Sequence, residues 1–193
     1  MFQPGLELDF KTVLSFAPAL VSGVRTTLLL TGLTIALGTP IGIALGVLLR
    51  FRSPIIRLPL LFLIDIIRSL PVLILILWVY YVVPALLGLP TISSFTLATL
   101  ALVANLAAFV ADIVRGAIAG VPRGLIDAGY ASGLSRLAVL RRVTLPLVIR
   151  ELLPTLALLW IDMLKLSSLA SVISVYELVH TADKIRSETF RAI

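Results

Sequence analysis

Residues 127–146 read DAGYASGLSRLAVLRRVTLP, and this stretch decides how the rest of the sequence is interpreted. It is the only long stretch that is both basic and amphipathic, with arginines set among small and aliphatic residues at helical spacing. Gly133 predicts that one helix ends there in a left-handed cap, and Ser135 predicts the N-cap of the next. Pro146 fits the first turn of a further helix. The stretch therefore predicts a compact helical knob between two apolar segments.

The remainder of the chain is strongly apolar. Of its 193 residues, 60% are hydrophobic and 13% are charged, and the mean hydropathy is +1.13. Soluble domains usually carry about 25% charged residues, so the composition predicts one all-α membrane domain, a polytopic helical bundle. The net charge of +6 does not indicate nucleic-acid binding, because the basic residues do not form a run interleaved with aromatic side chains. The absence of cysteine and the single histidine exclude thiolate and histidine-rich metal sites.

Four apolar blocks predict spanning helices, because a helix needs about 20 residues to cross a bilayer. These blocks occupy residues 17–49, 71–89, 95–120 and 152–176. An interfacial helix is expected just before the second span, and Pro71 predicts a break between the two because proline lacks a backbone N–H donor. The residues after the fourth block form a polar tail.

The arginines between the blocks predict the orientation. Three lie in the turn 50–57 and six lie in 115–150, whereas the turn near 84–94 carries none. Cytoplasmic loops of membrane proteins are enriched in Lys and Arg. The loop 123–146 is therefore expected in the cytoplasm, with the N-terminus outside.

The spacing within the basic stretch is similar to the signature loop of the membrane subunits of ATP-binding-cassette importers. That signature has an acidic residue, two small residues, a glycine after three further residues, and an aliphatic-x-Leu-Pro group after nine more. The matching positions here are Asp127, Ala128, Gly129, Gly133, Val143, Leu145 and Pro146. The sequence departs from the usual Glu-Ala-Ala opening, with Asp127 for Glu and Gly129 for the second Ala, and it keeps the spacing.

The flanking residues resemble the polar-amino-acid branch of that family. RSLPV at 68–72 is similar to its Arg-Gly-Thr-Pro-Leu, and ADIVRGAIAGVPRG at 111–124 is similar to its Ala-Glu-Ile-x-Arg-Gly-Ala-Ile-x-x-Val-Pro-x-Gly. KLSSL at 165–169 is similar to its Lys-Asp-Thr-Ser-Leu, and VYEL at 175–178 also fits. The resemblance extends over roughly residues 20–190.

The resemblance implies a type I importer permease fold, with residues 1–193 as a single transmembrane domain and a fifth span expected beyond Ile193. It implies that the loop 123–146 docks on a separate ATPase subunit that holds ATP-Mg, while this chain holds no cofactor and catalyses no reaction. An ordinary amphipathic interfacial helix is the alternative for this loop. The implied docking residues are Asp127, Ala128, Gly129, Gly133, Leu134, Ser135, Arg136 and Pro146.

The same resemblance implies the remaining partners and the substrate class. A second permease subunit, identical or homologous, completes the pore in the lipid of a bacterial inner membrane, and an extracytoplasmic substrate-binding protein delivers the solute. The expected substrates are polar amino acids or related small zwitterions. The departures at Leu125, Leu166 and Ser167 are consistent with a divergent branch whose substrate lies outside the ordinary amino acids.

Polar residues inside the apolar blocks are candidates for the substrate path. Lys165 lies at the centre of the fourth block, where an unpaired Lys costs about 2.5 to 3.5 kcal/mol, and Asp162 is three residues away on the same helical face. Such acid–base pairs are either structural ion pairs or elements of the path, a clamp or a gate. The candidates are Arg68, Pro71, Asn105, Asp112, Asp162, Lys165 and Ser168.

Other functions find less support in the sequence. Glu177 and His180 are expected outside the membrane, either in a solvated loop or in contact with a binding protein. A free-standing channel or secondary transporter remains the alternative function, although that class often shows inverted repeats and none is found here. The sequence lacks a G-x-x-x-x-G-K-[ST] phosphate loop and offers no catalytic triad or paired carboxylates.

Overall fold

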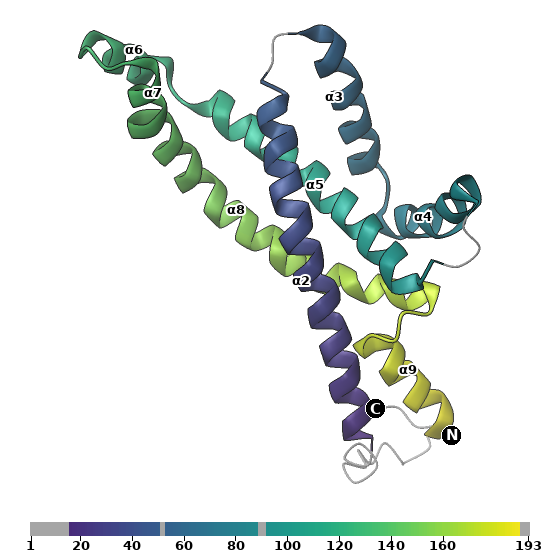
Figure 1. Cartoon of the computed structure of the whole chain (residues 1–193). Coiled ribbons are helices and arrows are strands. Elements are labelled where there is room, and N and C mark those ends of the chain that lie inside the picture. The colour runs from purple at the N-terminus through teal and green to yellow at the C-terminus, as the bar shows by residue number, and fades with distance from the viewer. Residues whose placement is uncertain (1–15, 51–52, 89–91, 190–193) are drawn as a thin grey trace, which may run out of the picture.

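The computed structural model describes residues 16–50, 53–88 and 92–189, and every regular element within these ranges is a helix. Two long apolar helices, α2 (Ala17–Leu48) and α5 (Ser94–Gly120), match the first and third predicted spans. Figure 1 shows α2 crossing α5 and α8 (Leu145–Leu166), while α5 and α8 converge on the loop that carries α6 and α7. The all-α bundle predicted from composition is confirmed.

The interface between α2 and α5 is built on glycines. Gly38, Gly42 and Gly46 recur at every fourth position of α2, on one face of the helix, and all three are buried. A methyl group added at Gly42 would lie 2.5 Å from Cβ of Val110 and 2.7 Å from the carbonyl oxygen of Ala107. The two backbones therefore approach closely, as small residues permit between membrane helices.

The second predicted span, 71–89, contains one helix of a bent pair. The interfacial helix α3 (Pro54–Ser69) and the following α4 (Val72–Leu87) meet at an angle of 111°. Pro71 is the N-cap of α4, so the predicted break is confirmed. α4 has 16 residues and is therefore about 24 Å long, shorter than the hydrocarbon core of about 30 Å. The described residues thus hold three helices suited to cross a membrane, and a fourth only if the bent pair counts as one span.

The fourth predicted span, 152–176, begins inside a longer helical run that becomes 3₁₀-helical near its end. A four-residue helix, α7 (Arg136–Val139), leads through a π-helical turn, η1 (Leu140–Thr144), directly into α8. A 3₁₀ segment, η2 (Ser167–Ile173), completes a helical run of 38 residues. The predicted start at 152 missed this run because the arginines before it interrupt the apolar pattern.

The predicted polar tail is partly a helix, α9 (Leu178–Thr189), which packs against the first half of α2. A methyl group added at Gly23 of α2 would lie 3.0 Å from Cα of Leu178. The close approach of the two helices explains why a polar amphipathic segment is ordered there. The expected fifth span lies outside the described residues.

Candidate functional site

A tight reversal of the chain joins α6 (Arg123–Ala131) to α7 at one end of the bundle. Gly133 takes the left-handed conformation with φ +79°, as predicted. Its N–H donates to the carbonyl of Tyr130 at 3.0 Å, and the N–H of Leu134 donates to the carbonyl of Gly129 at 3.2 Å. These two bonds form a Schellman motif, which satisfies carbonyls that the helix end would otherwise leave unpaired. The reversal is therefore fixed by the backbone.

Ser135 starts the second helix of the loop, as predicted. Its hydroxyl accepts a hydrogen bond of 3.3 Å from the N–H of Ala138. Pro146 lies in the first turn of α8, as predicted, and the π-helical turn joins α7 to α8 without a break. Pro146 cannot donate to the carbonyl four residues before it, and a widened turn is one way in which a helix accommodates that loss. The second half of the loop is thus one continuous body with the membrane helix.

Gly129 allows the two loop helices to touch. It is buried, and a methyl group added there would lie 3.1 Å from Cγ2 of Val139. Since 3.1 Å is too short for relaxed carbon–carbon contact, Val139 occupies the volume that a second alanine would need. The departure at Gly129 from the Glu-Ala-Ala opening therefore has a local cause in packing.

The outer surface of the loop is open. Asp127 and Ala128 are exposed, and two large aliphatic side chains, Leu125 and Leu137, are 46% and 56% exposed. Leu134 is half-buried. An apolar surface on a loop outside the spanning helices is a common feature of protein contacts. The expected docking residues therefore lie together at one end of the molecule, most of them exposed, with Gly129 buried between the two loop helices.

The candidate path residues fall into separate groups. Arg68 on α3 and Asp112 on α5 form an interhelical ion pair of 2.8 Å, and Asp112 also pairs with Arg115. Asp65 lies 3.9 Å from Arg68, whose guanidinium stacks over the ring of Phe109 at 5.3 Å from the centroid. The Arg68–Asp112 pair therefore joins two helices, whereas the Asp65–Arg68 and Asp112–Arg115 pairs each lie within one helix.

The second group lies on α8. Asp162 and Lys165 pair at 3.4 Å, as predicted, and their side chains are 56% and 73% exposed. The hydroxyl of Ser168 donates to the carbonyl of Lys165 at 2.7 Å. Asn105 belongs to neither group, because it is buried on α5 and its amide makes no hydrogen bond in the described residues. Within the described ranges, the ion pairs and side-chain hydrogen bonds of the α3–α5 group and those of the α8 group do not connect the two groups.

Glu177 corrects the expectation of a solvated loop. It is 1% exposed, and its carboxylate accepts hydrogen bonds from the N–H groups of Val179 and His180 at 2.9 and 2.8 Å. The hydroxyl of Thr27 on α2 also lies 3.5 Å from Oε2. Glu177 therefore caps α9 and ties it to α2. An acidic residue at the start of an amphipathic run was the available signal.

Comparison with known proteins agrees with this architecture. Residues 38–191 match the family described as "Binding-protein-dependent transport system inner membrane component". The chain is 34% identical over 188 residues to the glutamine transport system permease protein of Escherichia coli K12, covering 97% of this chain and 86% of that protein. It is also 34% identical to the octopine transport system permease protein of Rhizobium radiobacter, covering 91% and 74% of the two chains.

Solved structures show the same relationship. A crystal structure of an amino acid ABC transporter with histidines has a TM-score of 0.87 and 32% identity, covering 96% of this chain and 86% of that one. An inward-facing MetNI methionine ABC transporter has a TM-score of 0.75 and 25% identity, covering 92% and 85%. The extent of the sequence match and of the shared fold shows that the chain belongs to the family of inner membrane components of binding-protein-dependent transport systems.

Proposed function

We propose that this chain is the pore-forming permease of an ATP-driven importer for polar amino acids or related small zwitterions. In this proposal the loop 123–146 docks on a separate ATPase that binds ATP-Mg, and a substrate-binding protein delivers the solute from outside. The amino-acid importers among the relatives support the substrate class. The basic residues around the loop support its placement in the cytoplasm.

The continuity of the loop with a spanning helix carries the proposal. The Schellman turn fixes α6 on α7, and α7 continues through η1 into α8. A displacement applied to the exposed loop would therefore move the helix that carries Asp162 and Lys165. A docking loop of this construction transmits a motion of the bound ATPase to the spanning helix through continuous helical backbone.

The exposed ion pair on α8 supports a second permease subunit. Each charge at the bilayer centre costs about 2.5 to 3.5 kcal/mol on insertion scales, and large apolar residues such as Leu158 and Ile161 are also exposed on this helix. A partner permease would cover the apolar side chains, and water enclosed between the two chains would solvate the ion pair. A homodimer and a heterodimer meet this requirement equally.

Reconstitution in proteoliposomes tests the function. The permease would be purified with the ATPase subunit that accompanies it, and uptake of labelled glutamine and of basic amino acids would be followed with a binding protein outside. Uptake that requires both ATP in the ATPase compartment and the binding protein supports the proposal. Uptake or ion conduction by the chain alone, without ATP, would move it to the channel or secondary-transporter class.

A further inference from the structure

The loop end of the bundle holds a basic basin, made of two adjoining pockets. One pocket of about 530 Å³ is lined by residues of the loop together with Arg50, which follows α2. The other, of about 410 Å³, lies between the ends of α2 and α5, the start of α3 and the start of α6. Arg50 and Ile126 line both pockets. The two pockets therefore adjoin, and residues of α2, α3, α5, α6, α7 and η1 bound the basin that they form.

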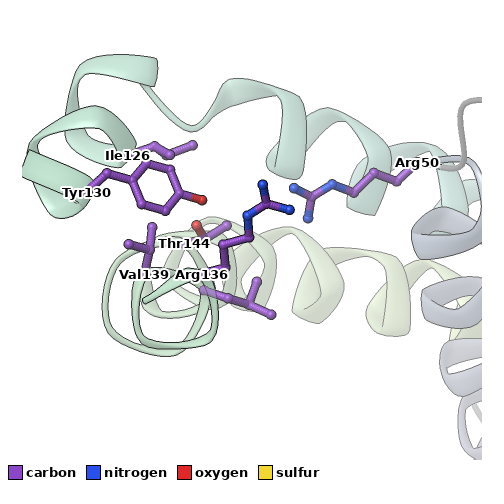
Figure 2. Close-up of a pocket in the computed structure, with 7 residues that line it drawn as sticks. Arg50, Ile126, Tyr130, Arg136, Val139 and Thr144 are labelled. Atoms are coloured by element: carbon purple, nitrogen blue, oxygen red, sulfur yellow. The ribbon is translucent and has the colours of Figure 1, made fainter. Parts of the chain in front are cut away.

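Five arginines line the basin and no carboxylate does: Arg50, Arg57, Arg115, Arg123 and Arg136. Within the described residues, Arg115 alone among these five has an ion-pair partner, Asp112. Figure 2 shows the guanidinium groups of Arg50 and Arg136 pointing toward one another across the larger pocket. Two like charges that face each other repel, and an anion between them offsets this repulsion. The arrangement therefore favours a bound anion.

Neutral groups add to the fit. The hydroxyl of Tyr130 points into the same pocket, beside Arg136 (Figure 2). Guanidinium groups form forked, charge-assisted hydrogen bonds with phosphate, and a phenol can donate one more. The donors gathered here match the several acceptor oxygens of a phosphate group.

The smaller pocket has apolar side chains as well as arginines in its walls, and these apolar side chains bear on the source of the phosphate. They include Leu49, Ile118, Val121 and Ile126, which lie where the spanning helices end. The adjacent α3 exposes many large side chains, among them Phe62 at 69%. An isolated inorganic phosphate gains nothing from such walls, whereas a phospholipid places its acyl chains beside apolar surface and its phosphate beside arginine. Basic pockets between membrane helices on the cytoplasmic side are known to hold anionic lipid headgroups.

We propose that the basin binds the headgroup of an anionic phospholipid, with its phosphate between Arg50 and Arg136. A phosphate held by both side chains links the end of α2 to the start of α7. The lipid then fixes the loop against the first spanning helix, so that bilayer composition influences the position of the loop. Only one part of this inference rests on the proposed function: the cytoplasmic orientation of the loop decides which leaflet supplies the lipid.

Lipid retention measured by native mass spectrometry tests the proposal. The purified full chain in nonionic detergent would be given phosphatidylglycerol or phosphatidylcholine with the same acyl chains. We expect preferential retention of phosphatidylglycerol. The double variant Arg50→Gln/Arg136→Gln is expected to lower phosphatidylglycerol retention by about tenfold or more. A loss of about tenfold corresponds to the loss of about one charge-assisted hydrogen bond.

Two matched variants control for net charge and for folding. Arg25→Gln/Arg150→Gln makes the same change of charge at exposed arginines outside both pockets, and retention should stay at the unmodified level. Arg50→Lys/Arg136→Lys keeps the charges and should keep most of the retention. If the Gln double variant does not purify in folded form, the single variants Arg50→Gln and Arg136→Gln, with intact thermal unfolding, carry the comparison.

Three results would overturn the proposal. Equal retention of the two lipids, or equal losses in the Gln double variant and its control, would show that the basin has no headgroup specificity. Inorganic phosphate that displaces the lipid at similar concentrations would assign the basin to a soluble anion. A third result has two parts: ATPase binding releases the lipid completely, and the Gln double variant no longer captures the ATPase. That result would assign the basin to the protein partner.

Discussion

Arg68 on α3 and Asp112 on α5 form an ion pair of 2.8 Å that joins the broken helix pair to the most buried helix of the bundle. The pair lies just before the 111° bend at Pro71. Since Asp112 also pairs with Arg115, one carboxylate holds two arginines. The orientation of the broken pair against α5 is therefore set partly by a single acidic side chain.

Asp112→Asn should destabilise the folded chain by about 1 to 3 kcal/mol, because two arginines lose a charged acceptor at a partly buried site. The matched control is Asp65→Asn, whose side chain is 65% exposed and lies 3.9 Å from Arg68. That change should cost at most about 0.5 kcal/mol. Thermal unfolding in detergent would measure both, and equal losses would refute the clamp.

Gly42→Ala should destabilise the α2–α5 interface by about 1 to 3 kcal/mol, because the added methyl group would lie 2.5 Å from Cβ of Val110. Gly32→Ala makes the same chemical change on the same helix, where nothing lies within 4 Å. It should be neutral or stabilise the helix by up to about 1 kcal/mol. Thermal unfolding of the two variants gives the comparison, and the opposite order would contradict close packing at Gly42.

Gly129→Ala and Val139→Ala should interact. Each alone should be destabilising, the first because its methyl group would lie 3.1 Å from Val139 and the second because it leaves a cavity. Together they should recover about 0.5 to 2 kcal/mol relative to the sum of the single changes, since each relieves the other. A double-mutant cycle measured by thermal unfolding tests this. Strict additivity would show that the two residues do not share the volume.

Glu177→Ala should release α9 from α2. The change removes the acceptor for two backbone N–H groups at the start of α9, worth about 0.5 to 2 kcal/mol, and the contact with Thr27. Hydrogen exchange within 178–189 should become faster, while exchange in α5 should stay unchanged. Glu151→Ala, at an exposed position, is the control and should leave α9 protected.

Lys165→Met tests the polar face of α8. The ion pair with Asp162 is exposed, so the change should leave the folded chain stable within about 1 kcal/mol. If the face lines the path, ATP-dependent uptake should fall at least several-fold while ATPase capture persists. Leu164→Met, an exposed neighbour, should leave uptake unchanged. Full uptake by Lys165→Met would make the pair structural.

Local signals in the sequence were sufficient for much of the site. Gly133 acts through its own backbone geometry and Ser135 through a hydroxyl that accepts from a nearby N–H group, and Asp162 and Lys165 are one turn apart, so spacing alone places these residues correctly. The break at Pro71 follows from the missing N–H of proline in the same way.

Features that depend on another segment could not be predicted from spacing. The Arg68–Asp112 pair and the burial of Glu177 need α3, α5 and α2 to be packed, because their partners lie far away in the sequence. The convergence of Arg50 and Arg136 has the same origin. The glycine series in α2 follows a small-xxx-small pattern that is present in the sequence. Because the whole helix is apolar, its composition does not reveal which face packs against α5.

The most direct test of the central claim is capture of an ATPase subunit by the tagged chain, comparing Gly133→Leu with Gly88→Leu. Both glycines have positive φ, +79° and +62°, with open space at the Cβ position, so each change brings similar backbone strain of about 1 to 2 kcal/mol. Only Gly133 lies in the loop. We predict that Gly133→Leu loses the ATPase and that Gly88→Leu retains it. Undiminished capture and transport by Gly133→Leu would contradict the docking role of the loop.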